Sequence, residues 1–358
     1  MGFLNLLTNR MKIVAGMSKY HYLGNPRPVF AHLLITNKCN LDCRYCFVKV
    51  NTIYKTDLDL EEWRQVVFDL KQRGCVAITL MGGEPLLFDG LNELVTYSKN
   101  LGLAVDLITN GIGIEKHIGT IRKVNSVMVS LDGNMEENDI NRGKNSFKHV
   151  IAAIRILKDY RVPVRINCMV ARQNKNAIPW LLEFAEEHKA PITFNLLSGF
   201  PHGAKDIEKE IMLSKKEVKE FYTQLLHYKQ NSPQKSSLIL ASVETLQRII
   251  EYPLPYQEII WRTPDDKRDS KNTCLFGQTW IHVNSNGDVY PCSQLWNQPE
   301  AFKPKSIRTD GIDAALENAR NLSCKSCFCP APGEWRRTFT PRGMLEGARV
   351  TLMQTLGS

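Results

Sequence analysis

Three cysteines lie close together near the start of the chain, at Cys39, Cys43 and Cys46. Their spacings of four and three residues allow one tight loop to present three thiolates to a single metal centre. A cubane iron–sulfur cluster has four irons, so three thiolates would leave one iron open to a further ligand. A structural zinc site is the alternative, but it would need a fourth Cys or His, and none follows within the loop. The cysteines alone leave both centres open.

Polar and glycine-rich segments follow several of the apolar runs downstream of this loop. Gly82, Gly83 and Glu84 follow one run, Asn110 follows the next, and Ser130 and Asp132 close a third. If these runs are parallel strands, their carboxyl ends meet at one edge of a sheet or barrel. We therefore expect these side chains to share one site with the cysteine loop.

The elements that would position this site alternate between strand-like and helix-like patterns. Strands are predicted over 31–36, 76–81, 103–108, 126–131, 164–170 and 192–197, and helices over 58–73, 91–100, 114–123, 146–160 and 177–188. In the first helix, apolar residues recur at helical spacing, Asp57 can cap the start and Gly74 the end. Six strands, five of them followed by a helix, predict a parallel sheet that is either open and doubly wound or an incomplete barrel.

Strand alternation predicts a polar inner face. In the strand 164–170, apolar residues alternate with Arg165 and Asn167, and the strands 126–131 and 192–197 alternate in the same way. If the apolar residues pack against outer helices, the polar ones line the interior. A barrel that holds a polar ligand suits this pattern; a hydrogen-bonded polar layer without a ligand is the alternative.

The cysteine triplet followed by Phe47 resembles the radical S-adenosylmethionine superfamily. Further motifs match in the expected order over roughly residues 31–200. They are Gly82-Gly83-Glu84-Pro85, Thr109-Asn110-Gly111, Ser130-Leu131-Asp132-Gly133, and the segment 138–147 that contains Arg142. Four ordered motifs on one predicted rim are far more specific than the cysteines alone.

The resemblance implies the cofactors and their contacts. A [4Fe–4S] cluster would bind the amino nitrogen and carboxylate of S-adenosylmethionine, with the Gly82–Gly83–Glu84 segment holding the amino group and Arg142 reaching the carboxylate. Ser130, Asp132, Arg165 and Asn167 would face ribose and carboxylate, Asn110 would belong to the same rim, and the backbone near Phe47 would meet the adenine. One electron from a donor such as flavodoxin or ferredoxin would release a 5′-deoxyadenosyl radical, which takes hydrogen from an unactivated C–H bond.

A second group of cysteines lies near the end of the chain. Cys274 and Cys292 flank a predicted hairpin with its turn at 284–287, and Cys324, Cys327 and Cys329 follow. This arrangement resembles the auxiliary iron–sulfur domains of the same superfamily, SPASM in the long form and twitch in the short form. Five cysteines support one auxiliary [4Fe–4S] cluster, with Cys327 or Cys329 as the fourth ligand. A four-cysteine zinc site is the alternative.

Composition and charge bear on the expected partners and location of the protein. The chain has 358 residues, of which 43% are apolar, and Lys plus Arg exceed Asp plus Glu by 46 − 37 = 9. The basic residues are scattered, apart from a few near the end, so we expect no nucleic-acid partner. The chain lacks an apolar run of about 18 residues, and polar residues interrupt the N-terminal segment, so a cytoplasmic location is expected. Residues 3–17 form a predicted basic amphipathic helix, which could dock on its own domain or make a peripheral membrane contact.

The predicted architecture is α/β, a partial (β/α)6 TIM-like barrel with a small C-terminal Cys-rich auxiliary-cluster domain. We expect an N-terminal extension over 1–30, the radical core over 31–230, a connector over 231–273 and the auxiliary domain over 274–358. The expected activity is hydrogen abstraction from a small biosynthetic metabolite or lipid. Maturation of a ribosomal peptide and addition of the adenosyl radical to an unsaturated substrate are the alternatives. The segment 1–38 is shorter than the winged-helix peptide-binding domain of many peptide-modifying relatives, which favours the small substrate.

Overall fold

The computed structural model describes residues 27–46, 56–197, 210–252, 276–296 and 302–322, the short strands 260–261 and 324–326, and positions 11, 15, 329 and 334. Several predictions fall outside these residues. They concern the helix over 3–17, Phe47, Cys274, Cys327 and the tail from residue 335.

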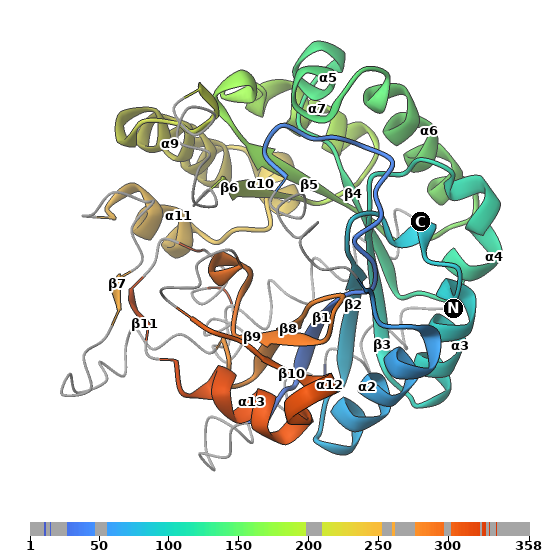
Figure 1. Ribbon diagram of the computed structural model, residues 1–358. Helices are drawn as coiled ribbons and strands as arrows, with labels where there is room; N and C mark the ends of the chain where they lie inside the picture. Colours follow the sequence, from blue (N-terminus) through green and yellow to red (C-terminus); the bar gives the residue numbers. More distant parts are fainter. Residues whose placement is uncertain are drawn as a thin grey trace.

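The first half of the chain alternates strands and helices, as predicted. In chain order it contains β1 (Phe30–Leu34), α2 (Leu60–Gln72), β2 (Ala77–Met81), α3 (Leu91–Asn100), β3 (Ala104–Thr109), α4 (Ile118–Ile121), β4 (Ser126–Ser130), α5 (Met135–Arg142), α6 (Ser146–Asp159), β5 (Val164–Val170), α7 (Ile178–Glu187) and β6 (Ile192–Leu196). Strands β1 to β6 are consecutive parallel neighbours. They curve into a wall with the helices on the outside (Figure 1), which confirms the partial barrel.

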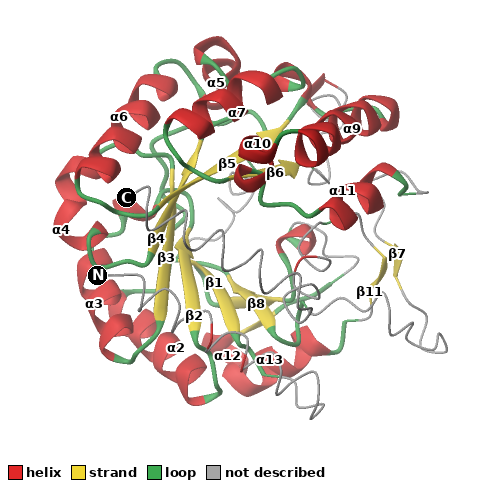
Figure 2. Cartoon of the chain, turned by 180° about the vertical axis from the view of Figure 1, so that it is seen from behind, coloured by secondary structure: helices red, strands yellow, loops and turns green. Residues whose placement is uncertain are grey.

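The second half completes the molecule. It contains α9 (Lys215–Asn231), α10 (Pro233–Leu238), α11 (Val243–Ile250), β7 (Ile260–Trp261), β8 (Trp280–Val283), β9 (Asp288–Tyr290), β10 (Lys305–Ser306), α12 (Ile307–Asp310), α13 (Ile312–Arg320) and β11 (Cys324–Ser326). The isolated bridge between Ile192 and Ile239 sets the end of α10 beside β6. Figure 2 shows α9, α10 and α11 beyond that edge of the wall.

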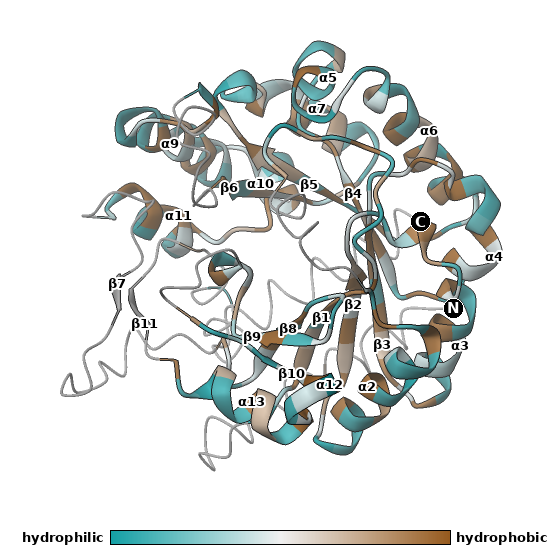
Figure 3. Ribbon diagram, viewed as in Figure 1, coloured by the Kyte–Doolittle hydropathy of each residue, from teal (hydrophilic) through white to brown (hydrophobic). Residues whose placement is uncertain are grey.

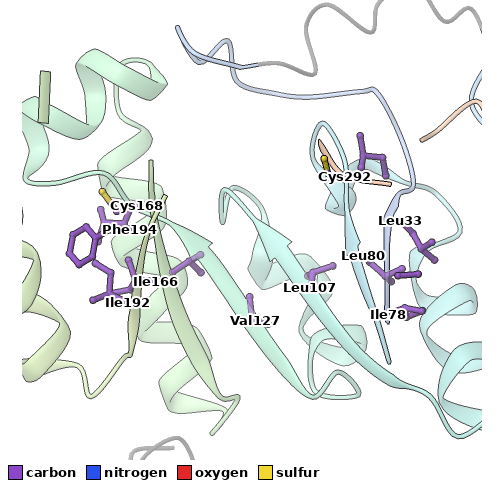
Figure 4. Packing of buried hydrophobic residues seen from close by; sticks show 14 of the residues in the cluster. Leu33, Ile78, Leu80, Leu107, Val127, Ile166, Cys168, Ile192, Phe194 and Cys292 are labelled. Carbon is purple, nitrogen blue, oxygen red and sulfur yellow. The ribbon is translucent and has the colours of Figure 1, made fainter. Parts of the chain in front are cut away.

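The hydrophobic core lies between the sheet and its outer helices. Alternate residues of each strand, among them Leu33, Ile78, Leu107 and Ile166, are fully or almost fully buried there, and Figure 4 shows them on neighbouring strands. The helices are amphipathic, with hydrophilic sides turned outward in Figure 3. This core uses one strand face, so the other face of each strand is left for the interior.

The predicted hairpin is present, and it belongs to the main sheet. β8 and β9 pair antiparallel around the turn at 284–287. β8 also pairs parallel with β1, so the nine-stranded sheet runs β10-β9-β8-β1-β2-β3-β4-β5-β6. The C-terminal segment therefore extends the wall past β1. Local sequence patterns do not reveal this partner, because β1 and β8 are about 250 residues apart in the sequence.

Two local predictions need correction. Asp59, not Asp57, caps α2: its side chain accepts a hydrogen bond from Glu62 N, and the Glu62 side chain accepts one from Asp59 N. This reciprocal pair explains why the helix begins two residues later. The predicted helix over 114–123 is a 3₁₀ turn at Ile114–His117 followed by α4, because His117 leaves the helical region at φ −112°.

Candidate active site

The cysteine loop leaves the carboxyl end of β1 and is fixed at its start by Asp57. One oxygen of this carboxylate accepts hydrogen bonds from Thr36 Oγ1 at 2.7 Å and from Asn37 N at 2.9 Å. Cys39 is exposed, whereas Cys43 and Cys46 are partly buried. The correction at α2 thus assigns Asp57 a different role, because it anchors the loop that carries the cysteines.

The three thiols lie within electrostatic reach of one another. Burial raises the pKa of Cys43 to about 12; Arg142 opposes this shift, while Cys46 and Cys39 add to it. Burial also raises the pKa of Cys39, and Glu84 and Cys46 contribute. Within the described part of the chain, no three Cys, His or acidic side chains converge on one point as the ligands of a single ion do.

The glycines of the second motif let its backbone lie directly on the cysteine loop. Gly83 N donates to Thr36 O and Glu84 N donates to Lys38 O, both at 2.8 Å. A Cβ built on Gly83 would lie 2.3 Å from Lys38 O. No side chain fits at that distance, so glycine is required for the close approach.

Glu84 is fixed at the point where the cysteine loop meets the end of β3. It is 1% exposed. Its Oε1 accepts hydrogen bonds from Thr109 Oγ1 at 2.7 Å and Leu86 N at 3.1 Å, and its Oε2 accepts one from Asn110 N at 2.8 Å. Burial raises the pKa of Glu84 to about 7, although these hydrogen bonds oppose the shift. A cationic ligand beside Glu84 would lower this pKa and keep the carboxylate ionised.

Asn110 links the same rim to the cysteine loop. Its Nδ2 donates to Asn40 Oδ1 at 2.8 Å, and its Oδ1 accepts from Ile112 N at 2.9 Å. Asn40 directly follows the first cysteine. Strand ends β2 and β3 are therefore both bonded to the loop, as the sequence predicted for neighbouring strand ends.

A buried ion pair supports the other side of the loop. Arg142 Nη2 donates to Asp132 Oδ1 at 2.9 Å, and the Tyr45 hydroxyl donates to Asp132 Oδ2. Met169 N also donates to Oδ1 at 2.9 Å. The Cys43 Sγ lies 3.8 Å from Arg142 O. Asp132 is fully buried, and in this structure it ties the cysteine loop to α5 and β5.

Helix α5, which places Arg142, was not among the predicted elements. Asn134 caps this helix: its side chain accepts a hydrogen bond from Glu137 N at 3.1 Å, and the Glu137 side chain accepts one from Asn134 N at 3.0 Å. This Asn-x-x-Glu pattern is a capping box with Asn in place of Ser or Thr. The sequence therefore contains a signal for the start of this helix. The helix also contributes Asn141, whose backbone O accepts a hydrogen bond from Arg44 N at 3.0 Å.

Two buried carboxamides flank the loop without using their hydrogen-bonding capacity. Neither side-chain atom of Asn37, at its start, nor of Asn141, beside Arg44, has a partner in the structure as described. Unsatisfied buried amides are costly, and a ligand at the loop would relieve that cost. Together with three thiols on one loop and a carboxylate against it, they fit a centre that holds a metal cluster and a polar cofactor.

The remaining predicted residues lie on the inner face of the strands, at different levels. Ser130 ends β4 and pairs in register with Asn167, whose Oδ1 accepts from Asn195 Nδ2 at 2.5 Å. Arg165 is the second residue of β5, and its Nη2 donates to Asp106 Oδ2 at 3.2 Å and Ser126 Oγ at 3.0 Å. The structure thus pairs Arg165 with a carboxylate near the amino ends of the strands.

The second cysteine group is described only in part. Cys292 is buried directly after β9, and Cys329 is partly buried with its carbonyl accepting a hydrogen bond from Arg248. Cys324 begins β11, whose backbone pairs with β7. The auxiliary ligand set remains a prediction.

Comparison with known proteins shows what the chain is similar to. Residues 33–185 match the Radical SAM superfamily. The chain is 30% identical over 185 residues to Fe-coproporphyrin III synthase of Methanosarcina barkeri, covering 50% of this chain and 46% of the relative. It is 30% identical over 164 residues to the sporulation killing factor maturation protein SkfB of Bacillus subtilis, covering 44% and 39%. In these comparisons the chain spans less than half the length of the curated relatives.

A solved structure shows the same fold. SuiB of Streptococcus suis, bound to its precursor peptide SuiA, superposes with a TM-score of 0.63 at 15% identity, covering 87% of this chain and 73% of SuiB. The segment 33–185 therefore resembles the radical SAM superfamily, and the fold of the chain agrees with that of SuiB. Among the described residues, no helix is long and apolar enough to cross a membrane.

Proposed function

We propose that this chain binds a [4Fe–4S] cluster through Cys39, Cys43 and Cys46 and reductively cleaves S-adenosylmethionine there. The observation that carries the proposal is the position of Glu84, buried against the cysteine loop and held by three hydrogen bonds. The bound cluster and cofactor would supply a 5′-deoxyadenosyl radical. The substrate is a small biosynthetic metabolite or lipid, from which the radical takes hydrogen.

The residues of the chain bind and orient the cofactor. Glu84 faces the cysteine loop, whose three thiolates would leave one iron of the cluster open to the cofactor. Its carboxylate therefore suits the cofactor's ammonium group. That positive charge would lower the pKa of Glu84 from about 7 and keep the carboxylate ionised. Gly82 and Gly83 allow the close approach, Asn110 fixes the rim to the loop, and Asp132 with Arg142 supports the loop from behind. Ser130 and Asn167 face the interior from which ribose is reached.

An auxiliary [4Fe–4S] cluster would bind to Cys274, Cys292, Cys324 and either Cys327 or Cys329. The support is the pattern of cysteines around the β8–β9 hairpin, since β8 is part of the barrel wall. Such a cluster could accept an electron from a substrate radical. An external reductant such as flavodoxin or ferredoxin would supply the first electron, and a cytoplasmic location would provide one.

The alternative is maturation of a ribosomal peptide by the same chemistry. Two observations favour it: one relative matures the sporulation killing factor, and the SuiB structure that shares this fold holds a precursor peptide. The relative that synthesises Fe-coproporphyrin III favours the small-metabolite reading. Addition of the adenosyl radical to an unsaturated substrate would need the same site.

Anaerobic reconstitution tests the proposal. The wild-type chain should bind about eight irons in two cubanes and release 5′-deoxyadenosine when it is reduced with S-adenosylmethionine present. Zinc bound at the second cysteine group would contradict the proposed auxiliary cluster. A chain that fills its first cluster and still cleaves no cofactor would contradict the proposed enzyme.

A further inference from the structure

The inner face of the barrel is partly exposed along β5 and β6. The exposure of β5 alternates strictly, with every second residue buried and Arg165, Asn167 and Met169 partly exposed. β6 repeats this pattern. β5 is flanked by β4 and β6, and its fully buried residues belong to the core under the helices. The partly exposed residues must therefore face the interior.

One level of this inner face is polar across five adjacent strands. In register, β8, β1, β2, β3 and β4 contribute His282, His32, Thr79, Asp106 and Ser126. Arg165 joins them from β5 through its bonds to Asp106 and Ser126. We call these six residues the polar layer.

The polar layer rests on an apolar floor. Two residues earlier in each strand, Phe30 pairs in register with Ala77 and with Trp280, and Ala77 pairs with Ala104. These residues pack together as a small separate cluster. Water or a ligand therefore reaches the polar layer from the carboxyl ends of the strands, where the cysteine loop lies.

Two atoms of the polar layer have no hydrogen-bond partner as far as the structure describes the chain, and one of them, Nε of Arg165, can only donate. Asp106 uses both oxygens, accepting from Ser126 Oγ at 2.7 Å and from Arg165 at 3.2 Å. Across the described structure, the buried Arg165 Nε and His282 Nδ1 find no hydrogen-bond partner. Arg165 is always a donor and always charged.

The two imidazoles are neutral and adjacent. The rings of His32 and His282 are 4.7 Å apart, and His282 is 4% exposed. Burial lowers the pKa of His32 to about 3, with Arg165 contributing, and it lowers the pKa of His282 well below its usual value, with His32 contributing. Each neutral ring keeps one N–H, so each can donate to an incoming oxygen.

We infer that the polar layer binds a carboxylate group of the substrate, with Arg165 as its principal contact. An anionic oxygen matches the unused guanidinium N–H and the imidazole N–H groups. A monoanion suits the layer better than a phosphate dianion, because Asp106 lies beside the same guanidinium. The inference rests on the proposed function and deepens it by naming a substrate class, and it assigns Arg165 to the substrate instead of the cofactor.

The depth of the polar layer sets the size of the substrate. His32 precedes Thr36, at the mouth of the cysteine loop, by four residues, which is roughly 13 Å along an extended strand. A molecule anchored by its carboxylate at the layer would therefore present a C–H bond near the loop about that far from the carboxylate.

Binding of benzoate and of its neutral isostere benzamide tests the inference. Both are measured by equilibrium dialysis against the full-length, reconstituted, unreduced enzyme saturated with S-adenosylmethionine, so that the cofactor's own carboxylate site is filled. Benzoate should bind at least about tenfold more tightly than benzamide. Equal binding of the two probes would overturn the inference.

Two variants locate the contact. Arg165→Gln should abolish the preference for benzoate, while Asp106→Asn should increase benzoate affinity, because it frees the guanidinium from its present partner. Arg64→Gln, which alters an arginine paired with Glu61 on the outer helix α2, should change neither. The Asp106→Asn result stands even if Arg165→Gln does not fold. A preference that persists in Arg165→Gln, or a loss of S-adenosylmethionine binding in its place, would overturn the assignment.

These outcomes are separate from those of the proposed function. The dialysis needs no reduction and no cofactor cleavage. Wild-type enzyme that prefers benzoate but never releases 5′-deoxyadenosine would contradict the proposed function alone. Enzyme that cleaves the cofactor without distinguishing the two probes would contradict the substrate class alone.

Discussion

At the scale of single residues, the site depends on charged groups whose burial is compensated by specific partners. Glu84 is the clearest example, because three hydrogen-bond donors partly offset the cost of burying its carboxylate. Asp132 is the second, with Arg142, Tyr45 and Met169 around it. Both lie against the cysteine loop, from opposite sides.

Substitution of Glu84 by Gln should weaken S-adenosylmethionine binding at least about tenfold, because the cofactor's ammonium loses a charged acceptor. Glu61→Gln, an exposed acid on α2, is the matched control and should bind as wild type does. The dissociation constants of the reconstituted proteins give the comparison. Equal affinity of Glu84→Gln and wild type would refute this role.

The raised pKa of Glu84 also predicts a pH dependence of stability in the cofactor-free protein. The folded state holds the proton up to about pH 7, whereas the unfolded chain releases it near 4.5. Stability contributed by this group is therefore present at low pH and lost as pH rises from 4.5 to 7. The difference in unfolding free energy between wild type and Glu84→Gln should change by up to about 3 kcal/mol across that range. A difference independent of pH would contradict this.

At the scale of elements, the site exists because loops and strand ends approach one another closely. The alternation of strands and helices could be predicted, and the bounds of α3 and β5 agree with their predicted ranges. The apolar pattern could not place the cap of α2, which depends on hydrogen bonds between polar groups. It also could not place α5, because this helix is short and mostly polar. The pairing of β8 with β1 joins distant segments and leaves no local signal.

The close approach at Gly83 can be tested directly. Gly83→Ala places a Cβ 2.3 Å from Lys38 O and should displace the cysteine loop, at a cost of about 1–3 kcal/mol and with reduced iron content. Gly119→Ala in α4 meets nothing within 4 Å and should raise stability by about 0.5–1 kcal/mol, since alanine favours helix. Thermal melting and iron analysis of the two variants report the contrast. Normal iron content in Gly83→Ala would show that the loop tolerates the shift.

At the scale of the whole molecule, the C-terminal segment is part of the barrel wall. β8 covers the edge of β1, and α12 contacts the beginning of α2 and the segment before it, where Arg308 bonds to Glu62 at 2.6 Å and to the backbone of Thr56 and Asp57 at 3.1 Å. Asp57 in turn fixes the cysteine loop. The hairpin that precedes Cys292 and the strand that leads into the first cysteine loop therefore belong to one sheet.

A chain that ends after Tyr252 should lose more than the second cysteine group. It would expose the backbone edge of β1, and unpaired edges of this kind associate with one another. We expect the truncated protein to aggregate, as measured by size-exclusion chromatography. A monomer that melts at the wild-type temperature would contradict the structural role of β8.

The central claim is that Cys39, Cys43 and Cys46 hold the cluster at which S-adenosylmethionine is cleaved. The most direct measurement is the amount of 5′-deoxyadenosine released per chain after anaerobic reduction, in wild type, Cys43→Ala and Cys75→Ala. Cys75 is a buried core cysteine whose thiol lies 3.2 Å from Ala77 O, so its variant controls for the loss of a thiol. Wild type and Cys75→Ala should release 5′-deoxyadenosine and Cys43→Ala none, while Cys43→Ala retains the iron of its auxiliary cluster. Equal release by Cys43→Ala and wild type would contradict the account.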